Sequence, residues 1–216
     1  MLRTKDNLRL FALTILMGIA PLKPALAEDA IFAGGCFWCV ESDFEALPGV
    51  LDAQTGFIGG SAAKANYKTV SKGGTGHYEA VLIRFDPAKI SYASLLHKFW
   101  RSVDPTDAGG QFCDRGDSYR TAVFPVSARQ EKTARVSKAK AEAALGQRIV
   151  TPILKAAAFY PAEAYHQDYY KSSKKALTRY GLITRKDAYK RYRDACGRDQ
   201  RIRALWGASA HSLPNG

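Results

Sequence analysis

Two cysteines lie three positions apart in the segment GGCFWCVE, residues 34–41. Apolar residues recur at helical spacing after the first of them, at Phe37, Val40 and Phe44, and this period predicts a helix that begins near Cys36. The unpaired N–H groups and the positive dipole end of a helix stabilise a thiolate in the first turn. Cys36 is therefore a candidate nucleophile, and an inert buried thiol is the alternative that the spacing alone leaves open.

A carboxyl group faces inward on a predicted strand. The segment HYEAVLIRF, residues 77–85, alternates along its length, and the alternation places Glu79 on the same face as Val81 and Ile83. A glutamate on a strand usually faces the solvent. A glutamate that faces inward without a partner is costly to bury. That cost favours a functional role for Glu79.

The chain has four cysteines, Cys36, Cys39, Cys113 and Cys196. Four cysteines allow three pairings, and the sequence alone does not choose among them. The single CxxC motif has no second CxxC or HxxxH to complete a zinc site, so we expect no metal. With four cysteines in 216 residues, the chain is also too cysteine-poor to be a disulfide scaffold.

The first 27 residues have the layout of a secretory signal peptide. A basic start, MLRTKDNLR, precedes the apolar run LFALTILMGIA, and PLKPALA ends in an A-x-A pattern, so cleavage is predicted after Ala27. An uncleaved anchor is the alternative, but the apolar run is short for a membrane span. Residues 28–216 contain no other run long enough to cross a bilayer, and we expect an exported, soluble protein in a compartment that permits disulfides.

The chain is basic, with a net charge of +12. Residues 1–27 carry four basic residues and one acid, so their removal leaves +9. A basic surface attracts nucleic acids and anionic membranes, but no base-stacking aromatic motif is present, and we expect no nucleic-acid partner. The basic residues are densest in residues 186–207, which we interpret as a solvated basic helix.

Strand-like and helix-like segments are mixed along the chain, and several candidate strands are adjacent in sequence. We expect strands at residues 30–33, 50–60, 77–85, 121–126, 149–154 and 156–160, and helices at 36–47, 91–103, 127–146 and 162–173. A long glycine-rich loop, residues 104–120, is of the kind that carries function. The pattern predicts one α+β domain over residues 28–216, a two-layer α/β sandwich whose mixed sheet is flanked by helices.

The segment GGCFWCVE resembles the signature of the A-class peptide methionine sulfoxide reductases. Three further segments resemble blocks of that family, in the family's order: TGHYEAV at 75–81, CDRGDSYRTAVFP at 113–125 and FYPAEAYHQDYY at 159–170. The resemblance covers roughly residues 29–197, and GCFW followed by TGH-x-E is highly specific. By this resemblance the chain is identified as a member of the family.

The resemblance implies a reaction in which the Cys36 thiolate attacks the sulfur of methionine sulfoxide. Glu79 matches the family's acid, and a carboxyl in an apolar pocket keeps its proton to higher pH, so that it can donate to the sulfoxide oxygen. Tyr67 and Tyr119 match tyrosines whose hydroxyls bind the same oxygen. Asp114 matches an aspartate that orients water or the donors.

Further residues of the motifs complete the implied site. Phe37 and Trp38 match the pocket that holds the S–CH₃ end of the substrate. Glu163, Tyr165 and His166 lie in the last family block, and we interpret them as structural support for the site without a chemical role.

A second thiol must regenerate Cys36, because its reaction leaves a sulfenic acid. That thiol condenses with the sulfenic acid to a disulfide, which a thioredoxin-like reductant opens by exchange. Cys39, one helical turn away, and Cys196, in the C-terminal segment, are both candidates. Our hypothesis is that Cys36 and Cys39 form the working pair, while Cys113 and Cys196, which fall outside the signature, form a structural disulfide.

The resemblance implies that the S epimer of methionine sulfoxide is the substrate, free or within proteins. We expect a monomer without a cofactor that repairs exported proteins under oxidative stress, in the periplasm. Two other function classes remain as alternatives. A periplasmic dithiol–disulfide oxidoreductase would use the CxxC motif but would not need Glu79, and a basic binding module would not need Cys36.

Overall fold

The computed structural model describes residues 26–214 of the chain. The predicted signal peptide, residues 1–27, lies outside this range except for its last two residues. Within residues 26–214, no helix is both long enough and apolar enough to cross a membrane. The fold below is therefore that of the segment from Leu26 to Pro214.

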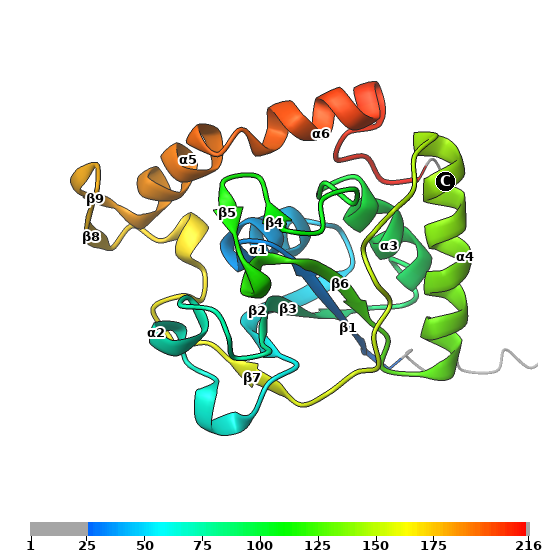
Figure 1. Ribbon diagram of the computed structural model, residues 1–216, viewed down its shortest axis with the longest axis horizontal. Helices are drawn as coiled ribbons and strands as arrows, with labels where there is room; N and C mark the ends of the chain where they lie inside the picture. The colour runs from blue at the N-terminus through cyan, green and yellow to red at the C-terminus, as the bar shows by residue number, and fades with distance from the viewer. Residues whose placement is uncertain (1–25, 215–216) are drawn as a thin grey trace, which may run out of the picture.

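A five-stranded sheet forms the centre of the molecule (Figure 1). Its strands are β1 (Glu28–Gly34), β2 (Val50–Ile58), β3 (Tyr78–Phe85), β6 (Thr121–Phe124) and β7 (Phe159–Pro161), in the order β6-β1-β3-β2-β7. All neighbouring strands in it are antiparallel. The predicted α+β fold, with helices flanking a sheet, is confirmed, but these five strands do not form the mixed sheet that we expected.

The strand predicted at residues 149–154 is reduced to one parallel bridge, between Ile153 and Val123 of β6. The N–H of Val123 donates to the carbonyl of Pro152, and the N–H of Leu154 donates to the carbonyl of Val123. Because proline has no N–H with which to extend a ladder, this pairing stops after one bridge. The strand expected at 156–160 appears instead as the shorter β7, at the opposite edge of the sheet.

Helices cover the sheet and close one side of the molecule. They are α1 (Phe37–Glu45), α2 (Tyr67–Val70), α3 (Tyr92–Trp100), α4 (Ala128–Leu145), α5 (Arg185–Ala195) and α6 (Arg198–Trp206), with short 3₁₀ helices η1 (Ala62–Lys64), η2 (Asp117–Tyr119), η3 (Tyr169–Lys171) and η4 (Gly207–Ser209). Two small hairpins complete the described fold: β4 (Gly110–Gln111) with β5 (Asp114–Arg115), and β8 (Lys175–Thr178) with β9 (Gly181–Thr184). In Figure 1, α5 and α6 run in succession along one side, from the β8–β9 hairpin toward α4.

Several helix ends follow local signals in the sequence. Ser91 and Ser127 cap α3 and α4, each by accepting the backbone N–H three residues later. Gly146 ends α4 in the left-handed region, with a φ of 68°. Cys36 is the N-cap of α1, so the helix begins one residue later than the cysteine itself.

The helix predicted at residues 162–173 is wrong. The segment forms turns, and only η3 within it is helical. Asp168 has a φ of 56°, in the left-handed region, which interrupts a right-handed helix. Glu41 of α1 supports this conformation, because its Oε1 accepts a hydrogen bond of 2.8 Å from the N–H of Asp168. As a result, Tyr169 lies flat against Trp38.

The two faces of the sheet are covered differently. Helices α1 and α3 pack on one face, where Phe32 and Val81 belong to the main hydrophobic core. The irregular segment before β7 covers the other face, where Leu154 packs on a second cluster that contains Ala80. Alternation along β3 therefore places Glu79 on the face toward α1, as the sequence predicted.

Candidate active site

A pocket of about 390 Å³ lies at the N-terminal end of α1. The predicted site residues line it together: Cys36, Phe37, Trp38, Cys39, Tyr67, Glu79, Cys113, Asp114, Tyr119 and Cys196. They come from α1, α2, β3, the loop that carries β5 and η2, and the end of α5. Residues from both ends of the described chain therefore share one cavity.

The backbone around Cys36 is fixed by a close approach that only glycine permits. Gly35 has a φ of 81°, and a Cβ at this position would lie 2.5 Å from the Cβ of Gln111. The carbonyl of Cys36 accepts the hydrogen bonds that begin α1. The next backbone N–H, that of Phe37, is one of the unpaired donors of the helix start, and it points to a side chain of the sheet.

The side chain that accepts the Phe37 N–H is Glu79. Its Oε2 accepts a hydrogen bond of 3.1 Å from the N–H of Phe37, which places the carboxyl group beside Cys36. Glu79 is 2% exposed, and burial raises its pKa from 4.5 to about 8, although the Phe37 N–H opposes this rise. At neutral pH the Glu79 carboxyl is therefore mostly protonated and can donate a proton.

The thiols of Cys36 and Cys39 are both free and line the same pocket. The neighbouring Cys39 thiol, and next burial, raise the pKa of Cys36, whereas the neighbouring Cys36 thiol lowers the pKa of Cys39. Two negative charges in one buried site repel each other, so the two thiols lose their protons as a pair. Burial and the neighbouring thiol therefore oppose the stabilisation of a Cys36 thiolate that the helix start provides.

Two tyrosine hydroxyls enter the same pocket. Tyr67 begins α2, where its N–H donates to Oε1 of Glu163 at 3.0 Å, and Tyr119 ends η2. Burial raises the pKa of both hydroxyls well above the usual range. Both therefore stay protonated and can donate hydrogen bonds. Asp114 of β5 also lines the pocket, and burial raises its pKa.

Aromatic rings form the wall beside Cys36. Trp38 stacks on Tyr169 with the ring centroids 3.8 Å apart. His166 packs against Tyr67 at 4.3 Å and against Phe37 at 5.0 Å. Neither ring nitrogen of His166 has a hydrogen-bond partner among the described residues, and burial lowers its pKa to about 4. A neutral ring packed in this way suits the supporting role that we assigned to it.

Arg198 closes the pocket from the C-terminal side, and the sequence analysis did not predict this. Its Nη2 donates to the carbonyl of Gly34 at 3.1 Å and to that of Ser102 at 2.9 Å. The guanidinium lies 4.7 Å from the ring centroid of Phe112. The start of α6 is thereby fixed to the backbone that leads into the nucleophile.

The interpretation of residues 186–207 as a solvated helix is wrong for its inward face. Arg198 is only 2% exposed, and Arg193 forms an ion pair of 2.9 Å with Asp43 of α1. A signal for this burial was present in the sequence. Arg198, Ile202 and Trp206 recur every four residues and are the buried residues of α6. This spacing is typical of the buried face of an amphipathic helix, and it would have predicted that Arg198 faces inward.

A disulfide joins Cys113 to Cys196, whose Cα atoms are 4.9 Å apart. It ties the β4–β5 hairpin to the end of α5, over the loop that carries Asp114. This is the pair that our hypothesis named, and it leaves Cys36 and Cys39 as thiols in the same pocket. Within residues 26–214, Cys113, Asp114 and Cys196 are also the one cluster of metal-ligand type, but the disulfide uses both sulfur atoms.

Known proteins resemble this chain over most of its length. The sequence profile of the family described as "Peptide methionine sulfoxide reductase" matches residues 28–197. A protein of Rhizobium meliloti is 47% identical over 194 residues, which are 90% of this chain and 91% of that protein. A protein of Caulobacter vibrioides is 46% identical over 198 residues, 91% of this chain and 94% of that protein. Both are named peptide methionine sulfoxide reductase MsrA 2.

Solved structures of other proteins have a fold similar to that of this chain. Mxr1 of Saccharomyces cerevisiae in its reduced form matches with a TM-score of 0.64 and 30% identity, over 68% of this chain and 86% of that one. Methionine sulfoxide reductase A of Corynebacterium diphtheriae matches with a TM-score of 0.61 and 31% identity, over 72% of this chain and 78% of that one. Sequence and fold thus lead to the same group of relatives.

Proposed function

The chain belongs to the peptide methionine sulfoxide reductase family, and on this premise we propose how its pocket works. The protein is an oxidoreductase that reduces methionine sulfoxide. One observation carries our assignment of the chemistry: the N–H of Phe37, next to Cys36, donates to the carboxyl of Glu79. A nucleophilic sulfur and a buried, protonated acid therefore face one cavity.

In the first step, the sulfur of Cys36 attacks the sulfur of the sulfoxide. Cys36 reacts as the thiolate, the form that the start of α1 stabilises. The Glu79 carboxyl donates its proton to the sulfoxide oxygen. In the adduct, the S–O bond and the new sulfur–sulfur bond both break. The oxygen, with its proton, is transferred to Cys36 as a sulfenic acid, and methionine is released.

The remaining pocket residues position the substrate. The hydroxyls of Tyr67 and Tyr119 donate to the sulfoxide oxygen, which gains negative charge as the S–O bond breaks. Phe37 and Trp38 receive the S–CH₃ group, because their rings form the apolar wall of the cavity. We assign Asp114 to the orientation of water beside the reacting oxygen.

The oxygen donors and the methyl wall have fixed places in the pocket, so one sulfoxide epimer fits both and its mirror form does not. Following the family, we propose that this is the S epimer. With dithiothreitol as reductant, the purified protein should reduce methionine S-sulfoxide, free or in a peptide, and leave the R epimer at less than about 1% of that rate. Chiral chromatography of the remaining sulfoxide measures both. Equal consumption of the two epimers, or of R alone, contradicts the proposal.

We propose Cys39 as the resolving thiol. After the first step it carries a proton next to the sulfenic acid of Cys36, so it can attack that sulfur while the hydroxyl leaves with the proton as water. Cys113 and Cys196 are already bonded to each other and offer no free thiol. The disulfide between Cys36 and Cys39 is then opened by a dithiol that supplies two electrons.

A single turnover should therefore link Cys36 to Cys39 and leave the Cys113–Cys196 bond intact. Mass spectrometry of the non-reduced, digested protein after one equivalent of sulfoxide measures both bonds. A Cys39→Ser variant should accumulate the Cys36 sulfenic acid, and its steady-state rate with a dithiol protein should fall by at least about tenfold. A Cys113→Ser/Cys196→Ser double variant is the control that keeps the working pair. A bond between Cys36 and Cys196 after turnover would reverse the assignment.

We propose the compartment of the reaction from the pattern of the first 27 residues. Their signal-peptide pattern supports export to the periplasm, where the protein would repair oxidised methionine in exported proteins. We propose a thioredoxin-like protein as the reductant, because opening the disulfide takes two thiols. Simple dithiol–disulfide exchange would need the CxxC motif alone, and it would leave Glu79, Tyr67 and Tyr119 around the thiols without a purpose.

A further inference from the structure

The β8–β9 hairpin projects from one end of the molecule (Figure 1). Its two strands are joined by Arg179 and Tyr180, and Leu177 lies directly opposite Leu182 in the ladder. Leu177 is 85% exposed and Leu182 is 64% exposed. Two large apolar side chains that stand together in water mark a surface that contacts another molecule.

The hairpin is also part of the rim of the catalytic pocket. Leu177, Thr178 and Arg179 line the same cavity as Cys36 and Glu79. A free amino acid occupies only the interior of such a cavity. A polypeptide whose oxidised methionine reaches Cys36 must leave the cavity across its rim, where the hairpin lies.

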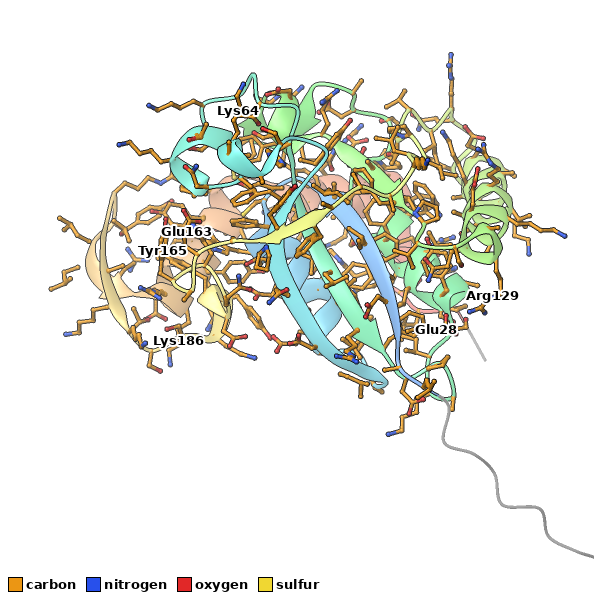
Figure 2. The ribbon with its side chains drawn as sticks, turned by 90° about the horizontal axis from the view of Figure 1, so that it is seen from below. Glu28, Lys64, Arg129, Glu163, Tyr165 and Lys186 are labelled. Atoms are coloured by element: carbon orange, nitrogen blue, oxygen red, sulfur yellow. A yellow bond between two sulfur atoms is a disulfide. The ribbon has the colours of Figure 1, made fainter. Side chains whose placement is uncertain are left out.

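A second exposed ring lies beside the base of the hairpin. The side chain of Arg185, the residue that follows β9, donates to the carbonyl of Tyr165 at 3.1 Å. Tyr165 is 45% exposed, and Figure 2 shows it with Lys186 on the side of the molecule where the hairpin lies. An exposed aromatic ring of the enzyme's body therefore lies on the same side of the molecule as the hairpin.

The charge of this region is strongly one-sided. Residues 174–193 contain eight basic residues and one acid, Asp187, which lies in the first turn of α5. In the described part of the chain, Lys174, Lys175, Arg179 and Lys186 form no ion pair with an acid. A partner with acidic side chains would be attracted to this surface and held in register by it.

We propose that the hairpin docks the polypeptide substrate: an extended segment of an oxidised protein with an apolar residue near the methionine sulfoxide and acidic residues beyond it. The inference rests on the proposed function, since it requires methionine sulfoxide to react in the adjoining pocket. The apolar neighbour packs on Leu177 and Leu182, and the acids pair with the lysines around them. Docking raises the affinity for polypeptides and leaves that for the free amino acid unchanged.

The test compares two substrates in dithiothreitol, so that no protein reductant takes part. One is free methionine S-sulfoxide, and the other is a ten-residue peptide with leucine beside the sulfoxide and four acidic residues. The variants are Leu182→Ser and Lys175→Glu, neither of which lines the pocket. The matched controls are Val136→Ser and Lys132→Glu on α4, whose side chains are also exposed.

Each hairpin variant should raise KM for the acidic peptide by about fivefold or more and change kcat/KM for the free sulfoxide by less than about twofold. The α4 controls should change neither. Raising the salt concentration should weaken the wild-type reaction with the acidic peptide far more than that with the free sulfoxide.

An unchanged KM for the peptide overturns the docking proposal, as does an equal change for both substrates. If the variants lose activity only when a thioredoxin-like protein replaces dithiothreitol, the surface binds the reductant and the proposal is also wrong. A wild-type enzyme that fails to reduce even the free sulfoxide would instead contradict the proposed function, so the two failures are distinguishable.

Discussion

Replacing Cys36 with serine should abolish the reduction of methionine sulfoxide, with kcat/KM falling by at least about 10⁴-fold. The reaction moves an oxygen atom onto the nucleophile, and a serine hydroxyl is too weak a nucleophile and forms no analogue of a sulfenic acid. The measurement is methionine released from the S epimer in the presence of dithiothreitol. Cys39 should not substitute, because its side chain is buried and lies a turn further into α1.

A control must show that the Cys36→Ser variant is folded. Thermal unfolding and the integrity of the Cys113–Cys196 bond should match those of the wild type, because Cys36 is an N-cap that makes no side-chain hydrogen bond to its helix. In dithiothreitol, Cys39→Ser should retain far more activity than Cys36→Ser, since a small thiol can reduce a sulfenic acid directly. A Cys36→Ser enzyme within about tenfold of the wild-type rate would remove the nucleophile from our mechanism.

The parts of the fold that the sequence predicts are those that local patterns determine. The alternation of side chains along β3 is enough to predict that Glu79 faces inward, because one face of the strand packs against the core. Ser127 and Gly146 bounded α4 because capping requires only the residues next to the helix end. The helical spacing of Phe37, Val40 and Phe44 likewise predicted the start of α1 near Cys36.

The parts that were missed depend on contacts between distant segments. The turn at Asp168 exists because Glu41, 127 residues earlier, accepts its N–H, and no local pattern reveals that bond. The β8–β9 hairpin was not predicted, and its tight turn at Arg179 and Tyr180 lacks the usual Asn-Gly signal. The raised pKa of Cys36 was missed for a different reason. The helix-dipole argument treats each thiol alone, whereas the pKa of each thiol depends on its neighbour.

Replacing Glu79 with glutamine should lower kcat for methionine S-sulfoxide by about 10²- to 10⁴-fold, the usual contribution of a general acid. Glutamine keeps the size of the side chain and an oxygen that can accept the N–H of Phe37, but it has no proton to give to the sulfoxide oxygen. Glu41→Gln is the matched control. Glu41 is also buried with a pKa raised to about 8, yet its carboxyl binds the Asp168 N–H and does not line the pocket, so its variant should keep most of the wild-type rate.

The pH dependence separates a proton donor from a residue that only fills space. Because the pKa of Glu79 is about 8, the wild-type rate should fall as pH rises above 8 and the carboxyl ionises, and Glu79→Gln should lack this decline. The two proteins also differ in how their stability depends on pH. The raised pKa adds stability to the wild type that is complete below pH 4.5 and lost as pH rises to 8, whereas the glutamine variant has no such loss. The variant should therefore unfold no earlier than the wild type at pH 8.5, so a slow reaction there cannot come from unfolding. A Glu79→Gln enzyme that keeps the wild-type rate, or that keeps the decline above pH 8, would show that another group supplies the proton.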